Sequence, residues 1–451
     1  MLKILIPFIL VAILSQFSFA GSKPIDTLLY SRAAEEYVVN FRALVQSDFK
    51  SLEQVRQFSG SQKQSFEEYV LKPTTKFLFG PMTNRSLGGE QKDFGLEILW
   101  QEAYLEGGLV IIPYEYSGLW LINKKIRPGR LFELPLPLNT RVVKTPLWKN
   151  CTDPLPDHQD FGSFWYYWDP ARTGCDHQLG KHFQIIKPQL KKKTAQTTVS
   201  YPEYDKMIRN KKVTLTFGFG YVEDPAEPMP FSDADYGMAE FRSFLSMIRN
   251  DLRIYNFKET EILEKEYLGG RRPDRRIGSR FEFEKQGLNL EVKVVASGSV
   301  DQMELFAKSF SHDHDAFFGW FGHSRVGNGF DALQFSRILK LNPSYYNLTP
   351  DYQMIYWAGC NSYSYYTKPF FDFKANLIPQ DVNGTKGLDI ISNALPSYFS
   401  LNADNAAVLL NSIVILEQRT SYQTIVNQIE RQSNASGIEV LVNVLGDEDN
   451  P

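Results

Sequence analysis

The sequence has almost no excess of charge, few cysteines and, beyond its first twenty residues, no long apolar run. Its 49 basic and 52 acidic side chains leave a formal net charge of −3. That balance predicts no global attraction to nucleic acid or to an anionic membrane surface. No stretch after the N-terminal segment is long and uncharged enough to cross a bilayer. The chain also lacks a glycine-rich phosphate loop with its lysine and a G-x-S-x-G elbow, so neither a P-loop nucleotide site nor a serine-hydrolase elbow is indicated.

The N-terminal segment, MLKILIPFILVAILSQFSFAGSK, has the pattern of a secretory signal peptide. Lys3 precedes an apolar run over residues 4–14, and Ser18 and Ala20 supply small side chains at the −3 and −1 positions. The run is shorter than the ~20 residues of a membrane span, although an uncleaved anchor is the alternative. We therefore expect removal of residues 1–20 and an exported protein, periplasmic or secreted, without an integral membrane span.

The composition predicts a folded chain of more than one domain. Hydrophobic residues make up 43% and aromatic residues 14% of the chain, which is ample for packed cores. Residues 24–79 show helical periodicity, and residues 94–143 have the pattern of strands broken by Gly and Pro. A polar stretch at 191–212 lacks apolar periodicity and marks the boundary. We expect a smaller N-terminal α+β domain over residues 21–195 and an α/β domain over residues 196–451.

The second domain alternates strand patterns with helix patterns. The expected strands are 213–221, 288–296, 316–322, 352–359 and 387–394. The expected helices are one containing Met238 to Leu252, with Ser232 or Asp233 as its N-cap, and three more over 301–310, 331–341 and 402–418. Such alternation predicts a mostly parallel sheet with helices on its faces.

Two of the three cysteines, Cys151 and Cys175, lie in a segment rich in Pro, Gly and aromatic residues. In an exported chain this placement predicts a disulfide, which contributes on the order of 3 kcal/mol by constraining the unfolded state. The alternative is a metal site in which four nearby side chains join the thiolates: His158, Asp176, His177 and His182. Their spacing matches no strong zinc pattern. The disulfide leaves Cys360 as an odd cysteine, which is either a buried hydrophobe or a reactive thiol.

A second candidate metal pair is found in SHDHD, residues 311–315. His312 and His314 are two residues apart and would share one face of a strand. No convincing third and fourth ligands accompany them, so a solvated pair is the preferred interpretation. We expect neither a metal nor another cofactor.

Two basic clusters, residues 191–193 and GGRRPDRRIGSR at 269–280, are interpreted as solvated loops. The second is expected between the first helix of the α/β domain and the next strand. Because it is polar and rich in glycine and arginine, we expect it to be the easiest internal site for trypsin.

Two consecutive apolar strand patterns end in FFGWFGHS and YWAGCNS, at His323 and Cys360. The carboxyl ends of parallel strands meet at one edge of a sheet, where active sites form. If these strands are neighbours, the imidazole and the thiol emerge together. An imidazole beside a thiol favours the thiolate and later protonates a leaving amine. Backbone N–H groups around Ser324 and Cys360 are candidates for stabilising an oxyanion.

The Gly-His-small and small-Cys strand ends resemble the caspase-like cysteine peptidases, a group that includes caspases, gingipains, clostripain and legumain. The resemblance covers roughly residues 210–420. It implies a caspase-like α/β fold in which His323 is the general base and acid and Cys360 is the nucleophile. Ser324 stands where the family usually has a glycine whose N–H helps to form the oxyanion hole. Gly359 stands where the family often has alanine.

Two functions follow as hypotheses. The first is an exported cysteine endopeptidase that acts on polypeptides through a His323–Cys360 dyad. The second is an inactive caspase-like protein that serves as a binding module at the cell envelope or surface. Asp331 and Asn361 are candidates for orienting the dyad, with turn or capping roles as the alternative. Arg325 is a candidate for selecting an acidic substrate group, with a plain surface role as the alternative.

Overall fold

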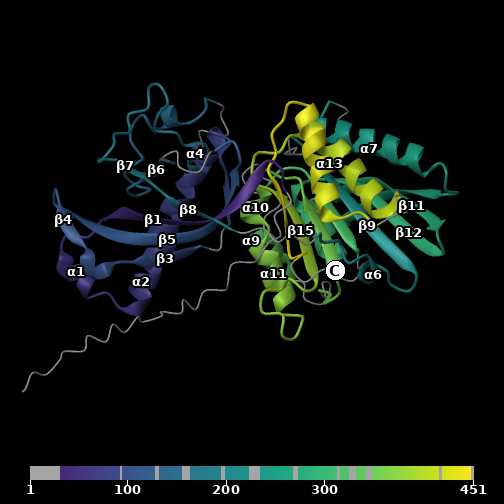
Figure 1. Cartoon of the computed structure of the whole chain (residues 1–451), viewed down its shortest axis with the longest axis horizontal. Helices are drawn as coiled ribbons and strands as arrows, with labels where there is room; N and C mark the ends of the chain where they lie inside the picture. The colour runs from purple at the N-terminus through teal and green to yellow at the C-terminus, as the bar shows by residue number, and fades with distance from the viewer. Residues whose placement is uncertain are drawn as a thin grey trace, which may run out of the picture.

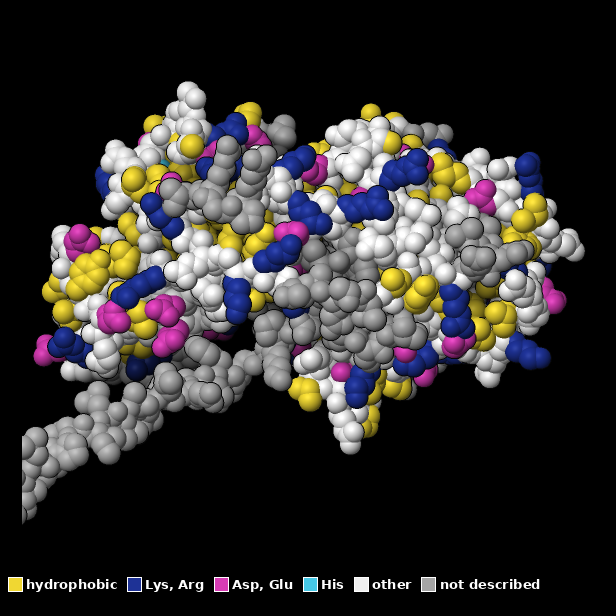
Figure 2. Space-filling view, in the orientation of Figure 1, with side chains coloured by type: hydrophobic (Ala, Val, Ile, Leu, Met, Phe, Trp, Pro, Cys, Tyr) yellow, Lys and Arg dark blue, Asp and Glu magenta, His cyan; other side chains and the backbone are white. Residues whose placement is uncertain are grey.

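The computed structural model describes two α/β units that lie side by side (Figure 1). It covers eleven stretches of the chain: residues 31–91, 94–126, 132–154, 163–193, 199–222, 234–267, 273–311, 315–324, 332–341, 348–415 and 419–447. The expected signal peptide lies outside them. On the face shown in Figure 2, basic and acidic side chains are scattered over both units. Within the described stretches, no helix has the length and apolar character that crossing a membrane requires.

The first unit is built on a six-stranded antiparallel sheet. Its centre is β1 (Ala34–Ser47), which pairs with β5 (Leu109–Asn123) along its full length. The remaining strands are β2 (Gly88–Glu90), β3 (Gly95–Ile98), β4 (Tyr104–Glu106) and β8 (Gln189–Lys192). A separate pair joins β6 (Leu134–Pro137) to β7 (Phe183–Ile186).

The expectation of helix from residue 24 is wrong for residues 34–47, which form β1. Tyr37 and Phe41, four residues apart, fit a helical face, but they also fit a strand, because four is a multiple of the two-residue strand period. Val39 and Ala43 are buried as well, which fixes the period at two. The helical elements begin later, as α1 (Leu52–Arg56), α2 (Gly60–Phe66), α3 (Lys72–Thr75) and α4 (Phe79–Asn84).

The second unit is built on an eight-stranded mixed sheet in the order β10-β11-β12-β9-β13-β14-β15-β16. The strands from β12 to β15 in this order run parallel, and antiparallel strands close both ends. The strands are β9 (Lys212–Gly220), β10 (Lys258–Tyr267), β11 (Pro273–Lys285), β12 (Leu288–Ser297), β13 (Phe317–Phe321), β14 (Gln353–Trp357), β15 (Leu388–Asn393) and β16 (Val442–Leu445). The five expected strands of this domain are present.

Helices cover both faces of this sheet. One face packs against α7 (Tyr236–Leu252), α12 (Asn402–Leu410) and α13 (Tyr422–Ala435). The other packs against α8 (Ser299–Ser309), α9 (Ala332–Leu341) and α11 (Lys368–Ala375). Two short helices complete the unit, α6 (Tyr204–Met207) and α10 (Ser362–Tyr365). The N-cap of α7 is Asp235, whose carboxylate accepts the N–H of Met238, rather than Ser232 or Asp233.

The arginine-rich segment is not the loop that we expected. Residues 273–280 belong to β11, which pairs with β10 in an antiparallel hairpin and with β12 on its other side. Residues 268–272 lie outside the described part of the chain. Residues 273–276 pair with β10 alone and residues 277–282 pair with both neighbours, so strand pairing rather than an apolar pattern holds this charged strand in the sheet.

The two units meet at the end of the large sheet formed by β15 and β16. Phe79 of the first unit stacks on Tyr365 of α10, with ring centroids 5.5 Å apart. Tyr166, in the short helix α5 (Phe164–Tyr167) of the first unit, belongs to the same apolar cluster as Phe79 and Tyr365. Figure 1 shows α10 beside the first unit. The short helix that follows Cys360 therefore lies at the interface of the two units.

Candidate active site

His323 and Cys360 emerge at the same edge of the large sheet. β13 and β14 are neighbouring parallel strands, in which Trp320 is paired with Trp357. His323 follows its strand by two residues and Cys360 follows its strand by three. The placement agrees with the expected topology, since both residues leave the carboxyl ends of adjacent parallel strands.

The two strand ends are in contact through Ser324 and Gly359. A Cβ atom built on Gly359 would lie 3.3 Å from both the backbone N and the Cβ of Ser324. Contacts that short are tighter than ordinary van der Waals packing, so glycine permits the approach of the two turns. Ser324 is buried. Its side chain lies in the contact between the strands.

The His323 ring is held between a backbone carbonyl and an aromatic side chain. Its Nε2 atom lies 2.7 Å from the carbonyl oxygen of Val222, and its ring is edge-on to Phe399 with centroids 4.9 Å apart. The N–H of Val222 donates to the carboxylate of Asp235 at 3.0 Å. A carbonyl oxygen can only accept, so Nε2 is the protonated nitrogen and the lone pair of a neutral ring lies on Nδ1. In this arrangement Nδ1 is the atom that can act as a base.

Cys360 is half-buried as a residue, and its thiol contacts the backbone of Ser397. The N–H of Ser397 donates to Sγ at 3.3 Å, and the thiol contacts the carbonyl oxygen of Ser397 at 3.6 Å. Burial raises the pKa of the Cys360 thiol, and the backbone hydrogen bond from Ser397 opposes that rise only in part. The resting residue is therefore a protonated thiol at neutral pH.

The segment 397–399 contacts both candidate residues, and it was not among the residues predicted for the site. Ser397 contacts the thiol, while Phe399 contacts the imidazole. The segment follows β15, the parallel neighbour of β14. A signal for it did exist, because a loop after the next parallel strand must reach the same sheet edge. Nothing in the residue types themselves marked the segment.

Asn361 supports the turn that carries Cys360. It is fully buried and has a left-handed backbone conformation, with a φ of 50°. Its N–H donates to the carbonyl of Leu395, and its side-chain amide donates to the carbonyl of Ala394, each at 2.9 Å. Its Oδ1 atom accepts a hydrogen bond from the hydroxyl of Tyr166. Asn361 therefore holds the loop instead of facing solvent.

The structure brings His323, Ser324, Gly359 and Cys360 to one edge of the sheet. No hydrogen bond joins the His323 ring to the Cys360 thiol, and both residues belong to the described part of the chain. Five other candidates lie outside the described residues: His158, His312, His314, Arg325 and Asp331.

Cys151 and Cys175 form a disulfide, as predicted, with their Cα atoms 4.7 Å apart. His177 lies beside them, within 4.8 Å of both sulfurs. Its Nδ1 accepts from the indole N–H of Trp168 at 3.0 Å, and its Nε2 donates to the carbonyl of Val143 at 2.8 Å. Because both ring nitrogens and both sulfurs are already bonded, the cluster is a structural clamp and not the alternative metal site.

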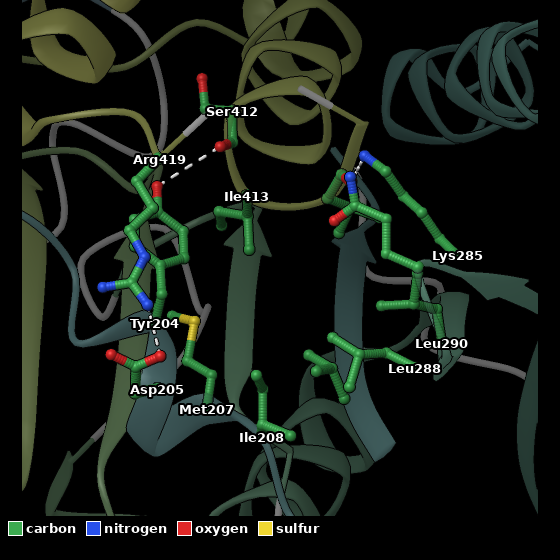
Figure 3. A pocket seen from close by; sticks show the side chains of 13 residues that line it. Tyr204, Asp205, Met207, Ile208, Lys285, Leu288, Leu290, Ser412, Ile413 and Arg419 are labelled. Carbon is green, nitrogen blue, oxygen red and sulfur yellow. Dashed lines mark hydrogen bonds and ion pairs between the residues drawn. The ribbon is translucent and has the colours of Figure 1, made fainter. Parts of the chain in front are cut away.

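A cavity of about 210 Å³ lies at the opposite edge of the large sheet. Its walls include Val213 and Leu288, at the starts of the parallel strands β9 and β12, whereas Cys360 follows the end of β14. Figure 3 shows Arg419 beside Asp205 on one side of the cavity and Lys285 on the other, with apolar side chains between them. The cavity is separate from the candidate active site.

Comparison with known proteins gives no assignment: no family model, no curated protein and no solved structure matches this chain.

Proposed function

We propose that this chain is an exported cysteine endopeptidase with a caspase-like α/β domain, in which Cys360 is the nucleophile and His323 is the general base and acid. The observation that carries the proposal is the pairing of β13 with β14, which delivers both residues to one sheet edge. The contact between Gly359 and Ser324 supports it further, because it brings the two turns together. The disulfide between Cys151 and Cys175 fits export to an oxidising compartment.

The proposed reaction is acyl transfer from a peptide bond to Cys360. The thiol proton moves to Nδ1 of His323 as the sulfur attacks the scissile carbonyl carbon. The imidazolium then gives this proton to the leaving amine as the C–N bond breaks, which leaves a thioester on Cys360. Water attacks the thioester carbonyl while His323 takes its proton. The C–S bond then breaks, the acid product leaves, and the imidazolium returns the proton to the sulfur of Cys360.

In the structure without substrate, the Cys360 thiol is not yet bonded to His323, so substrate binding has to rearrange its contacts. The thiol is bonded to Ser397, and the raised pKa of Cys360 keeps it protonated. Backbone N–H groups of Ser324 and Cys360 are the proposed donors to the oxyanion. Substrate binding has to bring Sγ and Nδ1 together, as catalytic hydrogen bonds often tighten only in the complex.

The first prediction is that Cys360→Ala and His323→Ala each lower hydrolysis of a mixed peptide library by at least about a hundredfold, the usual range for a lost general base or nucleophile. Ser397→Ala is the matched control. It keeps the backbone N–H and carbonyl that contact the sulfur, so its activity should stay near that of the unmodified protein. Mass spectrometry of the digests measures turnover.

A thiol-specific alkylator gives the second readout. Labelling of Cys360 at neutral pH should slow in His323→Ala, because the imidazole no longer accepts the thiol proton. A labelling rate that does not depend on His323, together with no hydrolysis of any peptide, would contradict the proposal.

That outcome would favour the alternative, an inactive caspase-like binding module at the cell envelope or surface. Two observations favour this second function. The thiol is bonded to Ser397 and not to His323, and a serine side chain is buried at the position of the glycine usual in the resemblance.

A further inference from the structure

One hydrogen bond joins the first unit directly to the turn that carries Cys360. The hydroxyl of Tyr166 donates to Oδ1 of Asn361, and both groups are buried. The two residues are 195 positions apart in sequence, and Asn361 immediately follows Cys360. Tyr166 also lies close enough to Cys360 for its pKa to be raised, first by burial and then by the negative charge that Cys360 carries when it ionises.

The hydrogen bond from Tyr166 helps to hold the left-handed backbone conformation of Asn361. A left-handed backbone is less favourable for residues other than glycine, asparagine being among the most tolerant of these, and it persists where the surroundings hold it. Two contacts within the second unit, to Ala394 and Leu395, hold the amide and the N–H of Asn361. The third, from Tyr166, satisfies the side-chain oxygen. A buried amide oxygen without a donor would carry a desolvation penalty.

Tyr166 is itself rigidly placed by its own unit. It lies in the loop closed by the Cys151–Cys175 disulfide, and its ring packs on Phe79 at 6.2 Å. Gly80 allows the loop to approach α4 closely, since a Cβ there would lie 2.1 Å from the carbonyl oxygen of Trp168. The disulfide and this close contact both restrain the segment that carries the tyrosine.

We propose that Tyr166 is a positioning residue for the nucleophile, acting through Asn361, and that the first unit is therefore an integral part of the active site. The consequence for catalysis rests on the proposed peptidase function. The effect on the reactivity of the Cys360 thiol does not rest on that function, because the turn carries Cys360 whether or not the protein hydrolyses peptides.

The test compares Tyr166→Phe with Tyr363→Phe in the full-length protein. Both changes remove one buried hydroxyl that bonds across the interface, since Tyr363 donates to Glu36 at 3.1 Å. Of these two hydroxyls, only that of Tyr166 donates a hydrogen bond to the side chain of Asn361. The probe is iodoacetamide, and because the other two cysteines form a disulfide, the mass shift reports Cys360.

We expect Tyr166→Phe to lower the pH midpoint of Cys360 alkylation by roughly half a unit, as a loosened turn lets water reach the thiol. We expect kcat for peptide hydrolysis to fall by about fivefold with little change in KM. Tyr363→Phe should leave both quantities unchanged. Equal alkylation profiles for the two variants would overturn the proposal, whatever the effect on hydrolysis.

A second variant tests whether the effect passes through Asn361. Asn361→Gly removes the side chain and keeps a residue suited to the left-handed backbone. If Tyr166 acts through Asn361, adding Tyr166→Phe to Asn361→Gly changes the alkylation profile no further. Additive effects would overturn this route. If alkylation of Cys360 depends on Tyr166 but the protein hydrolyses no peptide, the positioning role is supported and the peptidase function is rejected.

Discussion

A side chain at Gly359 would crowd its surroundings, and the residue nearest to it is Ser324. A Cβ at position 359 would lie 3.3 Å from the Cβ and N of Ser324 and 3.4 Å from the carbonyl oxygen of Gly322. The resemblance to caspase-like peptidases implies the opposite distribution, with glycine after His323 and often alanine before Cys360. Positions 324 and 359 therefore share one contact, so a side chain at one position limits what the other position can hold.

This pairing predicts a compensating double substitution. Gly359→Ala alone should lower the free energy of unfolding by about 1 kcal/mol, because the added methyl overfills the contact. Adding Ser324→Gly should recover part of that loss, since it removes one of the atoms that the methyl meets. Urea unfolding of the two single variants and the double variant measures the coupling. Strictly additive values would show that the two positions do not share the contact.

At the scale of elements, the sequence predicted those helices and strands whose apolar pattern fits only one kind of secondary structure. The buried strands β13 and β14 are apolar runs that lead into Gly-His and Gly-Cys, so their place in the chain could be predicted. β1 could not, because Tyr37 and Phe41 satisfy both periods and its partner β5 is distant in sequence. The charged strand β11 depends on its neighbours for its structure, which no local pattern reveals.

The candidate site also contains residues that could be predicted from the sequence and residues that could not. The shared sheet edge of His323 and Cys360 could be predicted from strand ends, whereas the individual contacts of Ser397, Phe399 and Tyr166 could not. Each of these three contributes through a contact with a residue far away in sequence. Their residue types carry no signal without the fold.

The start of β14 is held by a buried lysine on α11, which predicts a pH dependence. Lys374 donates to the carbonyls of Thr349 and Asp351 and to the side chain of Gln353. Burial, and then the nearby charge of Arg209, lowers the pKa of Lys374 to about 7. The unfolded chain then binds more protons than the folded one above pH 7. Stability should therefore rise from pH 7 toward 10, by at most about 1.4 kcal/mol per pH unit for one group.

Urea unfolding of Lys374→Met at pH 7 and pH 9.5 tests this slope, because the variant lacks the titrating group. The increase in stability of the unmodified protein over that interval should exceed the increase in the variant. Lys368→Met is the control on the same helix. Lys368 is partly exposed and pairs with Asp372, so its loss should not alter the slope. Parallel slopes in all three proteins would contradict the prediction.

At the scale of the whole molecule, the two units share buried polar groups as well as apolar surface. Glu36 of β1 is 2% exposed. It accepts from the hydroxyl of Tyr363 at 3.1 Å and from the amide of Asn443 at 3.0 Å. A carboxylate buried between units requires such partners. The interface is therefore specific in orientation, which the proposed role of Tyr166 requires.

The last prediction concerns the coupling of the two units through Glu36. Glu36→Ala leaves the buried donors of Tyr363 and Asn443 without this acceptor, so it should lower the free energy of unfolding by about 2–4 kcal/mol. Glu35→Ala is the matched control, because Glu35 pairs with Lys192 inside the first sheet and partly exposed pairs contribute roughly 0–1 kcal/mol. Urea unfolding followed by tryptophan fluorescence should show one transition for the unmodified protein and for Glu35→Ala, and two separated transitions for Glu36→Ala. A single unshifted transition in Glu36→Ala would mean that packing of the apolar surface alone, such as that of Phe79 on Tyr365, couples the units.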